Sequence, residues 1–455
     1  MKKVIALLLA LVLVLSMAAC TIEVHNYSNA GGPDATGTNS GGASPSGTNT
    51  PSNAGGSIKL FNGKIEIDPA LQNLAKAYEA ETGVHVEIES LGGGVDLQAT
   101  LKQYYQGGNM PDIFVGEGAE DFNNWTGMMA DMKDEAWAQD TEAEFVDDTG
   151  ATIGFPYTTE AIGLAYNKSI LEKAGVDPAS ITGPESMRAA FEALDAKKEE
   201  LGLTAVVGYC AESSSLYWSC AQHVFGNYLD AGLDRSDTTY IDLLMGEGHK
   251  LDETRFTHFA EMLALFHEFS DPSLLVSGTY DQQVMNFAAG KYAFVTQGSW
   301  IGASMKDAYK GEYEAAGSFE CGYVPYAFEE GIDTILTNSP SWWAVYKDGN
   351  VDAAKAFLQW VSTDAGQKFM VEEAGCVSPF ASCTLVADDP FAGAIAEYTA
   401  AGKTSSWHWL DQPGNLAQDY TGIIFQDYAA GKLDTAGYVS TMQQAIVSCF
   451  SALGS

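Results

Sequence analysis

The chain has few basic residues for its size. Its 23 lysines and arginines stand against 60 aspartates and glutamates, which gives 455 residues a formal net charge of −37. Proteins that bind nucleic acid gain affinity by neutralising phosphates with basic side chains, and anionic lipid surfaces attract the same side chains. The charge therefore argues against a nucleic-acid partner and against direct binding to an anionic membrane.

The motifs of several common metal and hydrolytic sites are missing. The sequence contains no Cys-x-x-Cys, no His-Glu-x-x-His and no Gly-x-Ser-x-Gly. The run at 92–94 is Gly-Gly-Gly, but no Gly-Lys-Ser or Gly-Lys-Thr follows it, so it is not a phosphate loop of the P-loop type. We therefore expect neither a metal ion nor a cofactor.

Cysteines are scarce, and they form two groups. Cys20 stands alone near the N-terminus, and six others lie between residues 210 and 449. An even number of cysteines outside the cell permits disulfides, with 15 possible connectivities for six. Short sequence separation favours two pairs, Cys210–Cys220 and Cys376–Cys383.

The N-terminus has the order of a secretory signal. Lys2 and Lys3 precede an apolar run at 4–15, which is too short to span a bilayer of about 30 Å, and small residues lead to Cys20. This pattern resembles a bacterial lipoprotein signal, in which the cysteine is lipidated. The alternative is an ordinary signal peptide with an incidental Cys20.

A segment rich in Gly, Ser, Thr, Asn and Pro follows the signal. Such a composition cannot bury enough apolar surface to offset its chain entropy. We therefore predict a signal peptide at 1–19 and a flexible tether at 20–56. The protein would sit at the extracellular face of the cytoplasmic membrane and touch it only through the lipid on Cys20.

About 400 residues remain, which exceeds the usual limit of roughly 250–300 residues for one hydrophobic core. Two lobes are therefore expected. Strands and amphipathic helices alternate from the start: a strand at 58–61, a helix between Asp68 and Gly83, a strand at 84–88, a helix between Asp96 and Gly107, and a strand at 112–115. This order predicts an α/β fold with parallel pairing, and it places the loops at 62–64, 92–94 and 116–118 on the ligand-binding edge.

Five segments, in order along the chain, resemble one family. They are Gly-Asn-Met-Pro-Asp-Ile at 108–113, the run from Phe155 to Lys168 that ends in Tyr-Asn-Lys, Gly-Lys-Tyr-Ala-Phe through Gly-Ser-Trp at 290–300, Ala-Ala-Lys-Ala-Phe-Leu at 353–358, and Gly-Lys-Leu-Asp at 431–434. The family is the extracellular solute-binding proteins of ABC importers, in the group that includes maltose-binding protein.

The resemblance implies a two-lobe type II periplasmic-binding-protein fold whose ligand cleft lies between lobes joined by several crossovers. We expect residues 57–158 and about 336–380 in one lobe, and 159–335 and about 381–455 in the other. It further implies a monomer that captures a carbohydrate by lobe closure and delivers it to the permease subunits of an ABC importer.

Sugar binding needs flat apolar faces that stack on the ring and polar groups that bond its hydroxyls. The resemblance points first to Trp300, beside Ser299 in a loop after a strand, and to Glu160 at the lobe crossover. Further candidates are Tyr157, Glu117, Tyr217, Trp218, Trp342 and Asn62, while Trp125, Trp407 and Trp409 are expected to be structural. Trp342 and Trp343 are adjacent, and we expect Trp342 to face the cleft.

Two other functions remain open at this point. Carboxylates and aromatic rings also suit a polyamine, so the same fold could hold one. A lipid-anchored glycoside hydrolase would need two carboxylates at a set separation, and a chain with 60 acidic residues always offers some pair. The ordered resemblance favours a binding protein over an enzyme.

Overall fold

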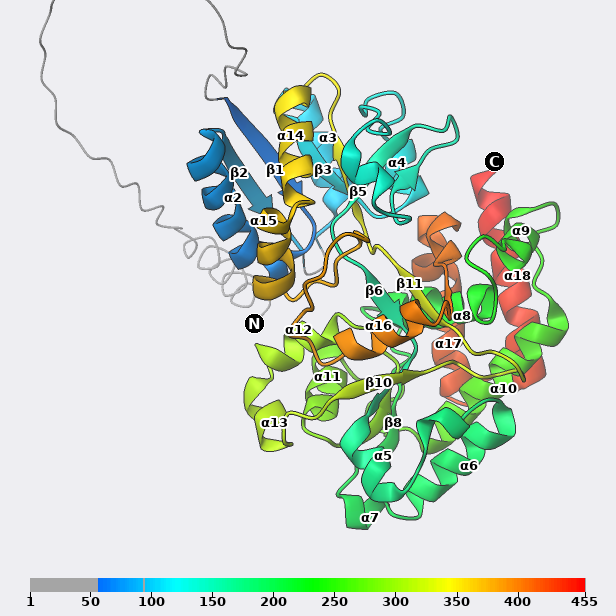
Figure 1. The fold of residues 1–455 in the computed structure, drawn as a ribbon. Coiled ribbons are helices and arrows are strands. Elements are labelled where there is room, and N and C mark those ends of the chain that lie inside the picture. The colour runs from blue at the N-terminus through cyan, green and yellow to red at the C-terminus, as the bar shows by residue number, and fades with distance from the viewer. Residues whose placement is uncertain (1–55, 93–94, 455) are drawn as a thin grey trace, which may run out of the picture. The chain divides into compact units, whose positions relative to one another are not determined.

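The computed structural model describes residues 56–92 and 95–454 (Figure 1). The predicted signal peptide, Cys20 and all of the predicted tether except Gly56 lie outside these residues. None of the helices in the described part combines the length and the apolar character that crossing a membrane requires.

Three β-sheets organise the described part of the chain. The first has the strand order β2-β1-β3-β12-β5-β4, the second β10-β7-β9-β8 and the third β13-β11-β6. Their bounds are β1 Ser57–Asn62, β2 His85–Ser90, β3 Ile113–Gly116, β4 Phe145–Val146, β5 Thr152–Pro156, β6 Glu160–Ile162, β7 Leu164–Asn167, β8 Ala205–Gly208, β9 Tyr292–Val295, β10 Cys321–Val324, β11 Ile335–Asn338, β12 Trp342–Val345 and β13 Thr404–Ser405.

Helices surround the first two sheets (Figure 1). With the six-stranded sheet, which we call lobe 1, lie α2 Asp68–Thr82, α3 Leu97–Gln106, α4 Ala119–Asn123, α14 Val351–Val361 and α15 Asp364–Gln367. With the four-stranded sheet, lobe 2, lie α5 Lys168–Ala174, α6 Pro184–Asp195, α7 Lys198–Leu201, α8 Phe225–Asp230, α9 Thr239–Met245, α10 Glu253–Phe269, α11 Tyr280–Ala288, α12 Ile301–Lys306, α13 Lys310–Ala315, α16 Ala392–Ala400, α17 Gly422–Ala429 and α18 Thr435–Leu453.

The first elements agree with the sequence patterns. β1 pairs in parallel with β2 and with β3, as strands joined by helical crossovers must. Asp96 caps α3 by accepting a hydrogen bond from the backbone N–H of Ala99, and Gly83 ends α2 in the left-handed conformation at φ 76°. Asp68 is the first residue of α2 and not its cap, because a short 3-10 turn precedes the helix. The α/β prediction is confirmed.

The chain passes between the lobes through the small third sheet. One crossover runs from β5 in lobe 1 through β6 to β7 in lobe 2, and another returns from β10 through β11 to β12. β6 and β11 pair antiparallel, with Glu160 opposite Asn338. The segment that leads into β6 and the loops at the carboxyl ends of β1 and β9 meet where the lobes join.

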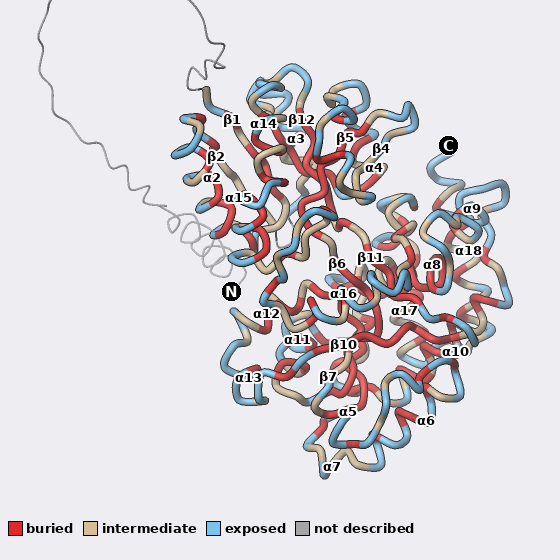
Figure 2. The backbone as a smooth tube through the Cα atoms, viewed as in Figure 1, coloured by how far each residue is buried: buried red, intermediate tan, exposed pale blue. Residues whose placement is uncertain are grey.

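Each lobe has its own hydrophobic core, and the strands between them are also buried (Figure 2). The core of lobe 1 joins strands that are far apart in the sequence. For example, Phe155 stacks on Trp343 with ring centroids 6.0 Å apart. In lobe 2 the helices α17 and α18 add their apolar faces to one side of the sheet. The lobe surfaces that face each other are therefore backed by rigid structure.

Neither of the predicted disulfides is formed in the structure. The six cysteines from Cys210 to Cys449 all lie in the described residues, and all are free thiols. Cys220 directs its Sγ to the carbonyl oxygen of Cys210 at 3.0 Å, and Cys210 directs its own Sγ to the carbonyl of Leu274 at 3.1 Å. Cys376 is buried in lobe 1 and Cys383 packs at its edge. Small sequence separation did not bring either pair of sulfurs together, and the buried thiols behave as small apolar groups.

Candidate functional site

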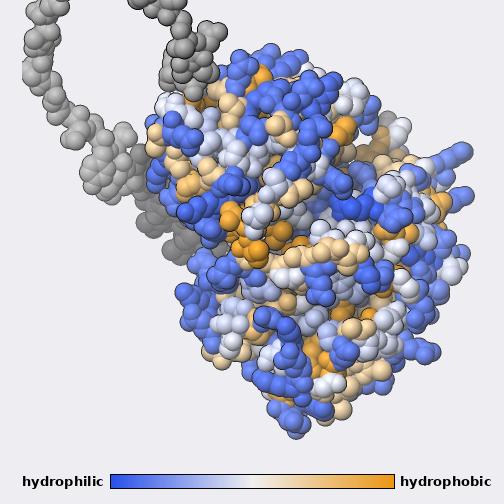
Figure 3. Space-filling view, viewed as in Figure 1, coloured by the Kyte–Doolittle hydropathy of each residue, from blue (hydrophilic) through white to orange (hydrophobic). Residues whose placement is uncertain are grey.

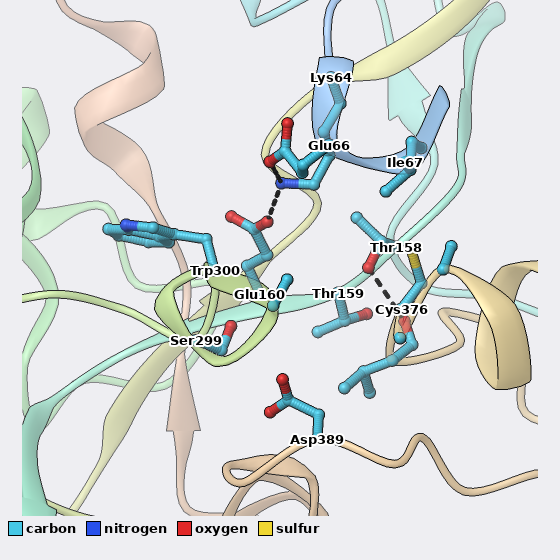
Figure 4. Close-up of a pocket in the computed structure, with 14 residues that line it drawn as sticks. Lys64, Glu66, Ile67, Thr158, Thr159, Glu160, Ser299, Trp300, Cys376 and Asp389 are labelled. Atoms are coloured by element: carbon cyan, nitrogen blue, oxygen red, sulfur yellow. Dashed lines mark hydrogen bonds and ion pairs between the residues drawn. The ribbon is translucent and has the colours of Figure 1, made fainter. Parts of the chain in front are cut away.

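A pocket lies where the two lobes and the crossover meet (Figure 4). Lys64 and Glu66 reach it from the loop after β1 in lobe 1, and Trp300 reaches it from the loop after β9 in lobe 2. Glu160 enters at the start of β6, and the carboxylate of Asp389 faces the same space from below in Figure 4. Thr158, Thr159, Ser299, Cys376 and Val377 complete much of the lining.

An ion pair links lobe 1 to the crossover inside this pocket. The Nζ of Lys64 lies 2.6 Å from Oε1 of Glu160 and 2.8 Å from Oε1 of Glu66. The side chains of Lys64 and Glu160 are only 15% and 8% exposed. Burial opposes the charge on Lys64, but the two carboxylates outweigh it and raise the pKa of this amine well above its usual value. Glu160 is predicted to accept hydrogen bonds from ligand hydroxyls, and one of its two carboxylate oxygens is already paired with Lys64.

Glu117 follows β3, at the same edge of the lobe 1 sheet. The residue is accessible to solvent, yet the protein around the junction restricts the hydration of its carboxylate; its backbone N–H donates to Oδ2 of Asp121 at 2.9 Å. Desolvation by the surrounding protein, followed by the charge of Asp121, raises the pKa of Glu117 to about 7, against the opposing field of Lys64. Tyr217 of lobe 2 lies within the field of Glu117, which adds to the effect of burial in raising the pKa of its phenol. The two predicted residues therefore interact electrostatically across the lobe junction.

Aromatic side chains gather on the lobe 2 side of the junction. We call Trp218, His223, Tyr280, Trp300, Trp407 and Trp409 the aromatic cluster. His223 is its centre, with ring centroids 4.7 Å from Trp300, 5.1 Å from Trp409 and 5.3 Å from Trp218. Trp300, Trp218 and Trp409 remain partly exposed, whereas Trp407 is buried as expected. The cluster offers flat faces of the kind on which sugar rings stack.

The local backbone fixes Trp300 in this arrangement. Its Nε1 donates to Oε1 of Gln297 at 3.1 Å. A Cβ on Gly298 would lie 2.1 Å from the Trp300 ring, so only glycine lets the indole fold back over the loop. Ser299 exchanges hydrogen bonds of 3.0 Å with the backbone of Ala161, which ties the loop to β6. Ser299 thus has its hydroxyl oxygen engaged as an acceptor while it lines the pocket.

Asn62 and Tyr157 lie behind the pocket wall. Asn62 is fully buried, and its amide donates to the carbonyl of Lys64 at 2.8 Å and to the Ser90 hydroxyl at 3.1 Å. Tyr157 is 1% exposed and stacks on Trp343 with centroids 4.5 Å apart. In this structure both residues support the loop that carries Lys64 and the crossover that carries Glu160.

The adjacent tryptophans are both buried, although Trp342 still borders the junction of the lobes. Trp343 is fully buried between Phe155 and Tyr157. Trp342 is 3% exposed and donates from Nε1 to the carbonyl of Ala143 at 2.6 Å. It lines a separate groove at the lobe junction, together with Arg235, Asn338 and His408 among others. The period-2 alternation of strand β12 sends the two rings to opposite faces of a sheet that is covered on both sides.

Several residues of the site escaped the sequence analysis. The loop at 62–64 is predicted to lie at the ligand-binding edge, which gives the position of Lys64. Its ion pair with Glu160 has no signal in the sequence. Trp409, expected to be structural, joins the aromatic cluster. His223 sits in a π-helix, η4 (Ser219–Val224), a distortion that sequence periodicity does not reveal. Asp389, whose pKa burial raises to about 7, precedes α16 without a recognisable motif.

The chemical character of the junction follows from these groups. Within the described part of the chain, no three His, Cys, Asp or Glu side chains are placed to hold a metal ion together. Burial lowers the pKa of His223 to about 3, so its ring is neutral at physiological pH. Neutral rings, hydroxyls and carboxylates, with one paired lysine, can stack on a polyhydroxylated ligand and accept its hydrogen bonds.

The sequence matches the profile of a known family over most of its length. Residues 73–401 match the bacterial extracellular solute-binding proteins. The chain is also 24% identical over 374 residues to the melibiose/raffinose/stachyose-binding protein MelE of Bacillus subtilis, with 79% of this chain and 81% of MelE covered.

Solved structures share the fold. The binding protein MsmE of Bacillus subtilis, in an open conformation, superposes with a TM-score of 0.68 at 20% identity, covering 89% of this chain and 100% of MsmE. A sugar transporter protein of Bacillus licheniformis in complex with stachyose gives a TM-score of 0.64 at 17% identity, covering 86% and 100%. These similarities confirm the two-lobe type II fold predicted from the sequence.

Proposed function

Because the chain belongs to the bacterial extracellular solute-binding proteins, we propose that it captures a sugar or oligosaccharide between its lobes for an ABC importer. The observation that carries the proposal is the juxtaposition of the aromatic cluster with Lys64, Glu160 and Glu117 at the lobe junction. Aromatic faces would stack on the sugar ring, and the carboxylates would accept hydrogen bonds from its hydroxyls.

The pairing of Lys64 favours a neutral ligand over a polyamine. A site for a polyamine needs buried carboxylates that await the positive charges of the ligand. Here Lys64 already occupies that place beside Glu160 and Glu66, at 2.6 and 2.8 Å. A second cation at the pocket would meet the charge of Lys64, whereas a hydroxyl group would not.

The size class of the sugar is proposed from the relatives. MelE is named for binding melibiose, raffinose and stachyose, and the Bacillus licheniformis structure holds stachyose. We therefore place galactose-containing oligosaccharides first among the candidates. Lobe closure would hold the sugar, and the closed form would deliver it to the permease as a monomer.

The anchoring of the protein is a further part of the proposal. The order of Lys2, the apolar run at 4–15 and Cys20 supports lipidation of Cys20 at the extracellular face of the cytoplasmic membrane. The composition of residues 21–56 supports a tether long enough for the lobes to reach a permease.

A hydrolase is the competing function. The carboxylate of Glu160 is already engaged in an ion pair with Lys64 at 2.6 Å, so it is not free to act on a glycosidic bond. This pairing argues against Glu160 as one of the two catalytic carboxylates that a hydrolase needs.

The test is a thermal-shift screen of the purified mature protein against melibiose, raffinose, stachyose, maltose and spermidine. A ligand that binds only the folded state raises the unfolding temperature as its concentration exceeds the dissociation constant. A saturable shift with one sugar class, with the sugar recovered unchanged by chromatography, supports the proposal. Shifts with spermidine alone, or conversion of the sugar, would overturn it.

A further inference from the structure

A short segment of lobe 2 meets lobe 1 at the junction. The 3-10 helix η6 (His408–Asp411) carries Leu410, whose carbonyl oxygen would lie 3.0 Å from a Cβ on Gly118 of lobe 1. Three residues after η6, the backbone N–H of Gly414 donates to the carboxylate of Glu120 in α4. The same segment carries Trp409 of the aromatic cluster, so it combines a lobe-to-lobe contact with a candidate ligand surface.

This segment is held from behind by one helix. Asp230 ends α8 and is 1% exposed, and its Oδ1 lies 2.5 Å from Nδ1 of His408. Its Oδ2 accepts a second hydrogen bond, 3.0 Å long, from the backbone N–H of His408. One carboxylate therefore fixes both the ring and the backbone of the first residue of η6.

The same helix also shapes the place of Trp409. A Cβ on Gly226 would lie 2.7 Å from the Trp409 ring, so the indole rests directly on α8 where that helix has no side chain. His223 lies in the π-helix that leads into α8. Its ring packs against the Trp409 indole, with the two ring centroids 5.1 Å apart. Positions 223, 226 and 230 follow helical spacing and lie on one face. On that face, the ring of His223, the open position at Gly226 and the carboxylate of Asp230 contact the segment from Trp407 to Leu410.

We propose that Asp230 and His408 are positioning residues for Trp409, and that the charge on His408 controls how firmly the closed cleft retains its ligand. The inference rests on the proposed function of the cleft, and it adds a pH-dependent device to it. Neither residue touches the pocket beside Glu160, so the effect would pass through Trp409.

The charges around His408 determine the direction of the effect. The groups that face its ring are Asp230, Asp411, Asp237 and Arg235, and Glu142 and Glu144 of lobe 1 line the same groove. Burial opposes the charged ring, but the hydrogen bond and charge of Asp230 outweigh it and raise the pKa of His408 above its usual value. The positive charge on His408 is therefore complete below the ordinary histidine pKa of about 6.5 and is lost as the pH rises through the raised pKa, which weakens the ion pair.

The first measurement uses the ligand-free protein, so it does not depend on the proposed function. Hydrogen exchange of residues 407–414 is followed in the mature wild type and in H408Q between pH 6 and pH 9.5, as protection relative to the intrinsic rate. We expect the protection of this segment to fall with rising pH in the wild type and to be low and constant in H408Q. Constant protection in the wild type would overturn the inference.

The second measurement follows raffinose binding over the same pH range. Because Glu117 and Asp389 also titrate near pH 7, only the difference between wild type and H408Q reports on His408. We expect H408Q to weaken binding about fivefold at pH 6, the order of a modest coupling between sites, and to match the wild type more closely at pH 9.5. An equal difference at every pH would indicate a structural role alone and would overturn the proposal.

Two further variants separate positioning from folding. H258Q removes a similar pair, since His258 lies 2.8 Å from Glu329 on lobe 2, and it should leave raffinose binding unchanged. In the background of W409A, H408Q should cause no further loss of affinity, because His408 acts through Trp409. Additive losses would contradict this route. A wild type that binds no raffinose would count against the proposed function, while the exchange data would still decide the positioning role.

Discussion

The ion pair between Lys64 and Glu160 allows a sharp prediction. Replacing Lys64 with methionine keeps most of the side-chain volume but leaves the carboxylate of Glu160, 8% exposed, without its partner at 2.6 Å. Removing one member of a buried pair costs about 3–5 kcal/mol because the other charge stays desolvated. Glu66, 43% exposed, remains in water and adds little to the loss. We expect K64M to lower the free energy of unfolding by about 3 kcal/mol at pH 8.

The pH dependence of this loss identifies its cause. A desolvated carboxylate without a partner is neutralised by protonation more easily than one in water. The penalty in K64M should therefore be large at pH 8 and smaller at pH 5. In the wild type the raised pKa of Lys64 means that its contribution is complete at both values and is lost only above about pH 10.5.

The assay is urea unfolding at pH 5 and pH 8, with two companion variants. K168M removes a pair of similar length, 2.5 Å from Lys168 to Glu320, whose side chains are 50% and 74% exposed, so its effect on the free energy of unfolding should be far smaller than that of K64M. The double variant K64M/E160Q removes both charges and should recover most of the stability. An equal loss in K64M at both pH values, or no recovery in the double variant, would refute the reasoning.

Three other predictions concern the site and the cysteines. Trp300→Ala should weaken raffinose binding by about tenfold or more, because a stacking contact is lost. Trp360→Ala, on the outside of lobe 1, is the control and should leave raffinose binding unchanged. Unchanged affinity in a folded W300A would remove Trp300 from the site. Because the pKa of Glu117 is raised to about 7, its carboxyl group becomes the stronger, charged acceptor only above that value, so sugar affinity should rise between pH 6 and pH 8 and E117Q should reduce the rise. Thiol titration of denatured protein, lacking Cys20, should find six free cysteines, and reductant should leave the unfolding temperature unchanged; fewer than six would point to a disulfide.

Local patterns in the sequence predicted the parts of the fold that depend on interactions between residues close together in the chain. Strands and helices of lobe 1, with the cap at Asp96 and the end at Gly83, follow from periodicity and from residue types that favour helix ends. The run from Phe155 to Lys168 marked a crossover between lobes, and the structure divides it among all three sheets.

What the sequence could not predict depends on contacts between distant segments. The partner of Glu160 is Lys64, 96 residues away, and no local pattern joins them. Trp409 looked structural because its contacts to Gly226 and His223 come from another element. The cysteine pairs failed for the same reason, since short separation says nothing about where each thiol points.

Apolar and polar surfaces meet at the boundary between the lobes, as Figure 3 shows on one face of the molecule. This is the boundary at which the pocket and the aromatic cluster lie. Capture of a sugar there would bury both kinds of surface at once, which is the combination that sugar recognition requires.

Titration calorimetry of the mature protein with raffinose and with spermidine tests the central claim most directly. The account predicts one saturable site for the oligosaccharide, a negative heat-capacity change from the burial of aromatic surface, and no saturable heat with spermidine. Saturable binding of spermidine, with no heat from raffinose, stachyose or melibiose, would contradict it.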